Sequence, residues 1–524
     1  MSEQPQRTLC KELGLFHITM TGLIGAIGTG ILFSTAKMTE MAGPAVILAW
    51  ILGGIFYLFI GLTYSEIGTV YPEAGGPSRY SLYTHGRITN MINAFADLLW
   101  YLFIPPIEAI AVVYGINYFT HNLLTPTGTP TLLGAVVAAV IVLLMIPFNY
   151  FGVKTFGISN ITLGTFKLIL YLLVAFGIIV TVFIPSNFTS LKGGFLPYGL
   201  AAMFMAIPYG MFAFGGVRVI PDFAEETRNP HKNIPLSIIL VVIGQLLVYI
   251  LFSIAFVSAI NWTKLNVTPG DWRSLTFISK TNPFLYLSGT YGVAWVFIIT
   301  LIVAILGPFI VGYIYLGGGT RILFAMGRSR YVPILMRFIH EKYAIPYCSL
   351  ITFGIIGILL ALLTAPIPSV YGLIDDAVVA GYMGFLTNPV AMIASRRQGK
   401  EPGFKLPGGF WIDLVAFIGA SYILYWSGWP AVPYATAFIF IASVIFGLIY
   451  KVKEHLRNAA WYITYIIILT LMTYIGQTAG GPVMLIPFPW DMVTVTILAI
   501  AFYTWGVFSG LPKPYAKYAL TETQ

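Results

Sequence analysis

The chain has 524 residues, of which 58% are hydrophobic and only 9% are charged. Because soluble domains carry about 25% charged residues, this composition excludes a soluble globular protein and indicates a polytopic membrane protein. The formal net charge of +9 would suggest a nucleic-acid partner in a soluble protein. The placement of the cations along the chain explains the charge differently, and we predict no nucleic-acid partner.

Fourteen apolar segments are each long enough to cross a bilayer, for which about 20 residues suffice. They comprise residues 13–37, 44–70, 91–119, 132–150, 158–184, 198–221, 234–260, 291–324, 347–364, 371–394, 411–428, 434–452, 460–478 and 489–510. The sequence therefore predicts an all-α protein with about fourteen transmembrane helices.

Lysine and arginine concentrate on the cytoplasmic side of membrane proteins. If the N-terminus is cytoplasmic, most of the 28 Lys and Arg residues fall in inside segments, and the outside loops carry Lys192, Lys264, Arg273 and Lys280. We therefore expect both termini in the cytoplasm. Attraction to anionic membrane lipid is a secondary consequence of the same charge.

The first span contains four closely spaced glycines: Gly22, Gly25, Gly28 and Gly30. A glycine inside a helix costs roughly 1 kcal/mol relative to alanine, so we expect the helix to open around Gly28-Thr29-Gly30. The second half of an opened helix directs its N-terminal N–H groups at an anion such as a carboxylate. A close helix–helix crossing is the alternative, and this stretch alone does not decide between them.

The sixth span is also rich in helix breakers. It contains Pro208, Gly210, Gly215, Gly216 and Pro221, and a proline inside a helix removes one backbone hydrogen bond. Two interrupted spans that stand five spans apart indicate two inverted repeats, with a binding site between the two breaks. The matching positions of the two interruptions favour an opened, substrate-binding helix over a close helix–helix crossing in the first span.

Several segments resemble signatures of the amino acid–polyamine–organocation (APC) transporters, in the family's order and spacing. They are residues 25–33 (first helix), 64–80 (second helix and following loop), 212–217 and 224–235 (sixth helix and its exit), and 321–333 (end of the eighth helix). The resemblance covers roughly residues 12–410.

This resemblance implies a LeuT-like fold of two inverted five-helix repeats. Residues 1–405 would form the ten-helix core, with repeats at about 13–184 and 198–394, and residues 406–524 would add four helices and a C-terminal tail. The resemblance also implies secondary active transport of amino acids or related amines across the cell membrane, by alternating access.

In the family, backbone N–H groups of helix one bind the substrate carboxylate, and backbone carbonyls of helix six bind its ammonium group. The substrate-binding residues implied here are Ile27, Gly28, Thr29, Gly30, Phe212, Ala213, Phe214, Gly215 and Gly216. The rings of Phe212 and Phe214 either close over the substrate, where they could stack on a cation, or pack between helices.

Lys167 lies about nine residues into the fifth span, which places it about 14 Å deep. A lone ammonium at that depth is costly and is a functional hypothesis by default. Sodium-independent members of the family carry a lysine at the matching place, so the resemblance implies proton coupling through Lys167. The alternatives are snorkelling toward the cytoplasm and a fixed structural ion pair.

Glu108 and Arg218 are possible accessory residues. Glu108, in the third span, either takes part in proton movement, meets a basic substrate, or stays protonated and bonds a backbone carbonyl. Arg218 departs from the family, in which glutamate or a small residue is common at this point of helix six. It either faces the site, which would disfavour a cationic substrate, or pairs with Asp222.

Other acidic residues in and beyond the sixth and tenth spans are assigned to gates. We expect Asp222, Glu225 and Glu226 to form a cytoplasmic network with Arg228 and Lys232. Asp375 and Asp376, near the outer end of the tenth span, are weaker candidates for a gate.

Other functional classes lack support in the sequence. The six histidines form no metal-ligand pair on one helix face, and no Walker A motif is present. We therefore predict no metal and no cofactor, with a proton gradient as the energy source. An ion channel would need repeated pore segments or rings of charge, and an embedded enzyme would need clustered catalytic groups. An exchanger or uniporter of amino acids or polyamines is the alternative within the same class. The substrate's side chain and the oligomeric state stay open.

Overall fold

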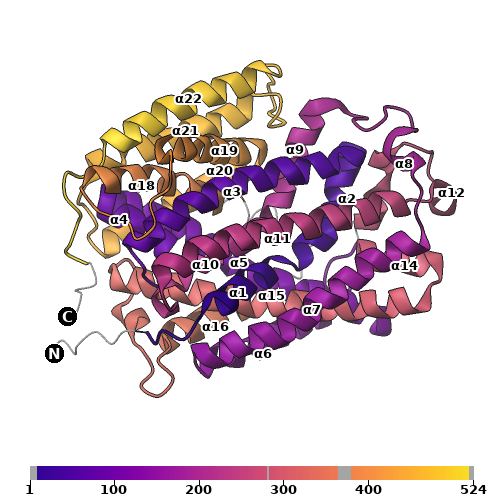
Figure 1. The fold of residues 1–524 in the computed structure, drawn as a ribbon, viewed down its shortest axis with the longest axis horizontal. Coiled ribbons are helices and arrows are strands. Elements are labelled where there is room, and N and C mark those ends of the chain that lie inside the picture. The colour runs from indigo at the N-terminus through magenta and orange to yellow at the C-terminus, as the bar shows by residue number, and fades with distance from the viewer. Residues whose placement is uncertain (1–8, 280–281, 364–378, 380, 519–524) are drawn as a thin grey trace.

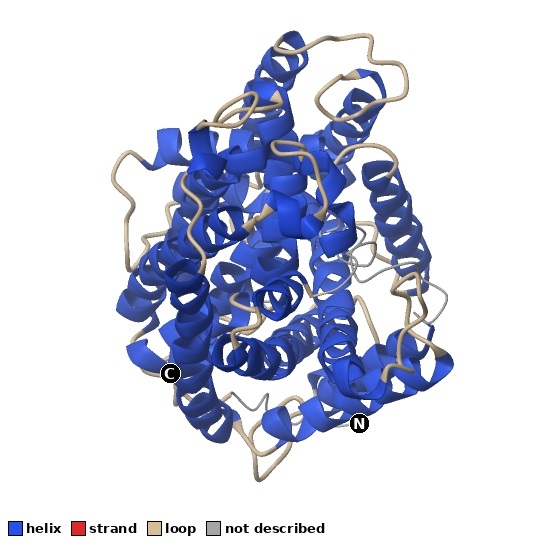
Figure 2. Ribbon diagram, turned by 90° about the vertical axis from the view of Figure 1, so that its right-hand side faces the viewer, coloured by secondary structure: helices blue, strands red, loops and turns tan. Residues whose placement is uncertain are grey.

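All secondary structure in the described part of the chain is helical. The computed structural model describes residues 9–279, 282–363, 379 and 381–518, and these residues contain no β-strand. Figure 1 shows long helices lying side by side along the longest axis of the molecule. Figure 2 shows the same helices after a 90° turn, closer to end-on. The predicted all-α architecture is confirmed.

The bounds of the helices follow the predicted spans closely. The first half contains α1 (Leu15–Ala26), α2 (Thr29–Ala42), α3 (Val46–Val70), α4 (Tyr80–His85), α5 (Arg87–Thr120), α6 (Leu132–Tyr150), α7 (Val153–Thr181) and α8 (Ser186–Thr189). The second half contains α9 (Gly199–Met211), the 3₁₀ turn η3 (Phe212–Gly215), α10 (Gly216–Asp222), the 3₁₀ turn η4 (Ala224–Glu226), α11 (Pro230–Ala259), α12 (Trp262–Leu265), α13 (Thr276–Ser279), α14 (Pro283–Tyr291), α15 (Ala294–Arg328), α16 (Tyr347–Leu363) and α18 (Thr387–Arg397). The last helices are α19 (Gly409–Trp426), α20 (Ala431–Ile449), α21 (Leu456–Ile475) and α22 (Trp490–Phe508).

The predicted count of fourteen spans is not confirmed. Within the described residues, 11 helical stretches are long and apolar enough to cross a membrane, and α1 and α16 are shorter apolar helices. The predicted tenth span, 371–394, lies partly outside the described residues, as do Asp375 and Asp376.

The first span is interrupted at the predicted place. Helix α1 ends at Ala26 and α2 begins at Thr29. Between them, Ile27 has φ −82° and ψ 92°, and Gly28 has φ −150° and ψ −132°. Both residues therefore lie outside the helical region of φ/ψ space, and the break falls on Ile27-Gly28.

The interruption of the sixth span is milder than expected. Helix α9 continues through Pro208 to Met211, and η3 then carries the chain to α10. Phe212 still has α-helical angles, φ −53° and ψ −43°, whereas Gly215 has φ −57° and ψ −18°. The backbone therefore tightens into a 3₁₀ turn without leaving the right-handed helical region. Pro208 does not break the helix because a proline removes only one backbone N–H, and neighbouring membrane helices hold the rest of the turn.

The two interrupted helices lie at the centre of the molecule. Helix α1 packs against α7, α10, α11 and α15, whereas α2 packs against α9 and α11. Helices α19 to α22 gather on one side in Figure 1, drawn in orange to yellow, and contact α3, α5 and α18. The outer faces of α6, α7, α11 and α20 expose large apolar side chains such as Leu144, Val180, Leu247 and Leu448, as lipid contact requires.

One end of the molecule is closed by buried ion pairs, which we call the ion-pair layer. Arg321 binds Glu226 through two contacts of 2.5 and 2.7 Å, and Arg328 binds Glu225 through two contacts of 2.6 and 2.9 Å. Its members are Glu73, Arg79, Glu225, Glu226, Arg321 and Arg328. The expected partners, Arg228 and Lys232, are therefore wrong: Arg228 pairs with Glu12 at the surface.

Both ends of the described chain meet the ion-pair layer. The N–H of Leu9 donates to Glu225 at 3.3 Å, and the carbonyl of Tyr518 accepts from Arg79 at 2.7 Å. Burial alone would raise the pKa of Glu225, but Arg328 and the N–H groups of Ala74 and Leu9 hold it below its ordinary value. The two chain ends thus lie on the same side of the fold, where the carboxylate of Glu225 binds the first and the guanidinium group of Arg79 binds the second.

The buried and exposed ion pairs should differ sharply in their effect on stability. We expect Arg321→Gln to lower the free energy of unfolding by about 3–5 kcal/mol, because Glu226 would remain buried without its partner. Arg228→Gln, which removes an exposed pair, should cost at most about 1 kcal/mol. Thermal unfolding of both variants in detergent measures the difference, and equal melting temperatures would contradict the structural weight given to the buried pair.

Candidate functional site

The two interruptions are in direct contact with each other. A Cβ atom placed on Gly30 would lie 3.0 Å from the Cα of Ala213 and 3.2 Å from a ring carbon of Phe212. Since real Cβ atoms rarely approach other atoms so closely, only glycine allows α2 to meet η3 at this distance. Sequence positions about 180 residues apart are thereby joined at the core of the fold, as the inverted-repeat interpretation requires.

Lys167 caps the end of α1 that the break exposes. Its Nζ donates to the carbonyl of Ile24, in the last turn of α1, at 2.7 Å and to the carbonyl of Gly307, on α15, at 3.2 Å. The last four carbonyls of a helix have no intrahelical partner and carry partial negative charge. The ammonium group satisfies one of them, and its 1% exposure excludes snorkelling.

Glu108 lies at the other side of the break, where α2 begins. The hydroxyl of Thr29 donates to its Oε1 at 2.6 Å, and Glu108 is fully buried. The hydrogen-bond partner that the structure gives Glu108 is therefore a hydroxyl donor in the first turn of α2. A carboxyl group at a helix N-terminus is favourable because the partial positive charge of the helix lies there.

Gly28 lies between α5 and α15 at the break. A Cβ atom here would lie 3.3 Å from Oε2 of Glu108 and 3.2 Å from the Cβ of Val311. Ile27, the other residue of the break, is fully buried. The predicted residues Ile27 to Gly30 therefore all lie in a narrow space between α5, α15 and η3.

The predicted residues of the sixth span divide into two groups. Phe212 and Ala213 face Gly30, and the carbonyl of Ala213 accepts a hydrogen bond from the hydroxyl of Tyr249 on α11. The ring of Phe214 instead packs against aromatic rings of α3 and α11, with centroids 5.8 Å from Trp50, 5.5 Å from Tyr57 and 5.0 Å from Tyr249. Of the two phenylalanines, Phe212 is thus the one that faces the break.

Gly215 and Gly216 permit close packing of η3 and α10. A Cβ atom on Gly215 would lie 3.0 Å from the indole of Trp100. One on Gly216 would lie 2.8 Å from the Cβ of Ala26 on α1. Gly216 therefore allows α10 to pack closely on α1.

Arg218 pairs with a residue that sequence reasoning missed. It forms a buried ion pair with Asp97 on α5, not with Asp222, and the hydroxyl of Tyr101 donates to Asp222 instead. Asp97 is an ionisable residue inside an apolar span, which is itself a signal of function or of a buried partner. Its partner could not be read from the sequence, because α5 and α10 lie far apart along the chain.

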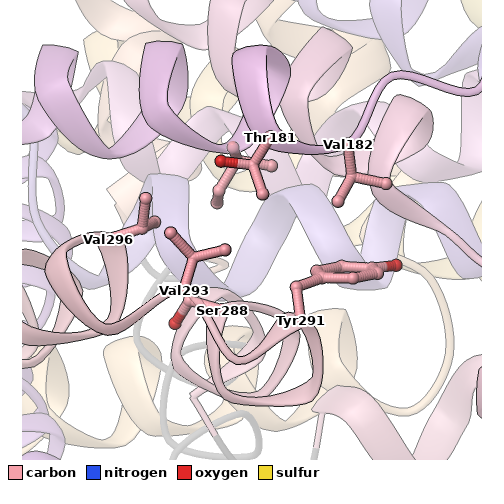
Figure 3. Close-up of a pocket in the computed structure, with 7 residues that line it drawn as sticks. Thr181, Val182, Ser288, Tyr291, Val293 and Val296 are labelled. Atoms are coloured by element: carbon pink, nitrogen blue, oxygen red, sulfur yellow. The ribbon is translucent and has the colours of Figure 1, made fainter.

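Neither of two measured cavities coincides with this site. Figure 3 shows a cavity of about 10 Å³ between the end of α7 and the turn from α14 to α15, lined by residues that include Thr181, Val182, Ser288 and Tyr291. It holds about one water molecule. A groove of about 340 Å³ lies between α5, α14 and α15, next to Tyr114, at the end of α5 away from the ion-pair layer. Among the described residues, no group of three His, Cys, Asp or Glu side chains could hold a metal ion.

Comparison with known proteins places the chain among transporters. Residues 17–412 match the family model described as amino acid permease. The glutamate/serine transporter AimA of Bacillus subtilis is 29% identical over 98% of this chain and 96% of its own length. An aspartate-proton symporter of the same organism is 28% identical over 97% of this chain and 98% of its length. The branched-chain amino acid permease BcaP of B. subtilis is 26% identical over 84% of this chain.

The contact between the two breaks can be tested without a ligand. We expect Gly30→Leu to lower the melting temperature of the purified protein by several degrees, because its side chain cannot fit beside the backbone of Ala213. Gly14→Leu is the control, since a Cβ atom there meets only His17 at 3.7 Å, an ordinary contact distance. If both variants melt at the wild-type temperature, α2 and η3 do not pack as closely as described.

Proposed function

Because the chain belongs to the amino acid permease family, we propose that it is a proton-coupled secondary transporter that moves amino acids across the cell membrane by alternating access. The family has the LeuT-like fold of two inverted repeats, and transporters of this kind bind substrate near the bilayer midplane at the interrupted helices. The contact between Gly30 and Ala213 supports a site at the two breaks of this chain.

The proposed substrate contacts use the polar groups at the two breaks. The α-carboxylate binds N–H groups at the N-terminus of α2, at Gly28, Thr29 and Gly30, where the partial positive charge of the helix lies. The α-ammonium group binds carbonyls of η3, with Ala213 the nearest to α2. Tyr249 now donates to that carbonyl, so the ammonium group replaces the tyrosine hydroxyl when substrate binds.

The position of Lys167 is the observation that supports proton coupling. Its ammonium group joins Ile24 on α1 to Gly307 on α15. Loss of the proton removes the charge that holds these two carbonyls together, and α1 is then free to move relative to α15. A ligand shifts a conformational equilibrium only through different interactions with the two conformations, and the proton on Lys167 meets this condition.

The names of two relatives agree with this proposal. One is called an aspartate-proton symporter, and another a glutamate/serine transporter. An amino acid exchanger or uniporter is the alternative within the same class, since the contacts at the breaks would serve it equally. Lys167 distinguishes them, because exchange without a gradient needs no change in its protonation.

We further propose the energy source, the lipid-facing surface, the orientation and the transport core of this protein. The proton gradient supplies the energy without a cofactor, and lipid surrounds the exposed apolar faces of α6, α7, α11 and α20. Both termini lie in the cytoplasm, together with the ion-pair layer. Residues 1–405 form the transport core, and residues 406–524 add the peripheral helices.

Transport in proteoliposomes tests the coupling role directly. With an imposed pH gradient, Lys167→Gln should lose uphill accumulation of the radiolabelled amino acid that the wild type accumulates, because the variant has no titrating amine at the end of α1. Exchange of internal for external substrate should persist. A thermal-shift screen of the standard amino acids first identifies the substrate to use.

Lys37→Gln provides the matched control. Lys37 bonds Glu40 at 2.9 Å in a partly exposed pair, so the same substitution removes a lysine that has no role at the break. It should accumulate substrate as the wild type does. Undiminished gradient-driven accumulation by Lys167→Gln would reject Lys167 as the coupling residue.

A further inference from the structure

Arg218 lies just beyond the break in the sixth span and is directed toward it. It stands three residues after Gly215, which is about 4.5 Å along a helix, and helical side chains lean toward the N-terminus of their helix. The indole of Trp100 confirms this direction, because it packs against Gly215 and also lies under the guanidinium, 5.1 Å from ring centroid to Cζ. One aromatic side chain therefore connects the proposed substrate site to Arg218.

The guanidinium group is buried with fewer partners than it can bind. Asp97 and the carbonyl of Gly381, at 3.1 Å, are its polar contacts, and the ring of Phe385 covers it at 5.0 Å. Arginine carries five N–H donors, and the Nε of Arg218 has no hydrogen-bond partner among the described residues. This arginine is fully buried, so the unused donor is held away from water.

Two further buried donors near Arg218 also lack partners within the described part of the chain. They are the indole N–H of Trp100 and the hydroxyl of Tyr57. Tyr57 stacks on Phe214 at 5.5 Å and meets the ring of Phe385 at 5.4 Å, which places it between η3 and the ring that covers Arg218. An unpaired buried donor is unfavourable because it has lost its hydrogen bonds to water, and a ligand rich in acceptors would relieve that cost.

We propose that Arg218 binds the side-chain carboxylate of the substrate, in exchange for Asp97, so that the site selects acidic amino acids. This inference rests on the proposed function, because it places the α-carboxylate and α-ammonium groups at the two breaks. Bidentate binding of carboxylate is the geometry for which the guanidinium group is best suited. An amide side chain lacks the charge to replace Asp97 and would leave the buried arginine unpaired.

Charge balance requires that one proton be taken up when the substrate carboxylate replaces Asp97 at Arg218. Arg218 and Asp97 now form a neutral buried pair, and a second carboxylate would leave one negative charge unpaired in a medium of low dielectric constant. An isolated buried charge is neutralised by protonation in preference to being kept. Asp97 therefore takes up one proton when the substrate carboxylate displaces it, beyond any proton that accompanies a neutral substrate.

Other titratable or charged groups also face this pair. They are Asp222 on α10, Tyr57 and Tyr64 on α3, Tyr315 on α15 and Tyr462 on α21. Among them, Asp222 is the other carboxyl group, and it already accepts a hydrogen bond from Tyr101. A test must therefore separate Asp97 from Asp222.

Calorimetric titration of the purified full-length protein with aspartate, glutamate, asparagine and glutamine tests the proposal. In the wild type, the acid should bind more tightly than its amide, and the ratio of the two affinities should rise about tenfold for each unit of decrease in pH. The ratio isolates the proton on Asp97, because protonation of Lys167 affects acid and amide alike.

Three variants assign the effect to the named residues. Asp97→Asn should keep the preference for the acid and lose its dependence on pH, whereas Asp222→Asn should keep both. The double variant Arg218→Gln/Asp97→Asn should bind acid and amide equally. The double substitution removes both members of the buried pair and strands no charge, so it preserves folding better than Arg218→Gln alone.

Each contrary outcome has a distinct meaning. A wild-type protein that binds the amides as tightly as the acids refutes the selection of acidic substrates and leaves the proposed function intact. Persistence of the pH-dependent ratio in Asp97→Asn refutes the exchange at Arg218. Absence of binding of every amino acid, in a protein that melts cooperatively, refutes the proposed function itself and this inference with it.

Discussion

The break between α1 and α2 is the constraint on which the centre of this fold depends. Ending one helix and starting another inside a membrane leaves backbone carbonyls and N–H groups without partners, and lipid offers none. The protein supplies an ammonium group for the carbonyl end, from Lys167, and a carboxyl group beside the N–H end, from Glu108. The helix dipole favours an ammonium group at the carbonyl end and a carboxyl group at the N–H end. The break is therefore maintained by two buried ionisable side chains, and any change in their protonation acts on it directly.

The ion-pair layer and the break act at different depths of the same helices. Helix α15 carries Gly307 at the level of Lys167 and Arg321 near its end, where it binds Glu226 just after α10. Helix α10 in turn begins at η3, which touches α2. A movement of α1 away from α15 would therefore be opposed at mid-depth by Lys167 and at the end of the molecule by the buried arginines. Such an arrangement permits two discrete packings more readily than continuous bending.

The sequence was sufficient to locate the break and the lysine but not the partners across helices. Dense glycine marked Gly28-Thr29-Gly30, which overlaps the observed break at Ile27-Gly28. Distance along the span placed Lys167 at mid-depth, and both predictions depend on one segment alone. The ion pairs of Arg218 with Asp97 and of Glu226 with Arg321 depend on how helices distant in sequence are rotated against each other. Spacing reveals only neighbours on one helix, which is why Arg228 and Lys232 were wrongly expected as partners of Glu225 and Glu226, and why Asp97 was not found. Pro208 was also given too much weight, since its helix continues to Met211.

The hydroxyl of Tyr249 on the Ala213 carbonyl has a consequence for selectivity among small molecules of similar shape. In the proposed binding mode, this hydroxyl occupies the position that the substrate's amino group would take. A ligand group that displaces this hydroxyl must itself donate a hydrogen bond to the Ala213 carbonyl. A cationic nitrogen donates a stronger, charge-assisted hydrogen bond. A 2-oxo acid with the same carbon skeleton has no N–H donor at this position and would leave the Ala213 carbonyl without a hydrogen bond. In the proposed binding mode, Tyr249 would therefore favour amino acids over their deaminated counterparts, whatever their side chains.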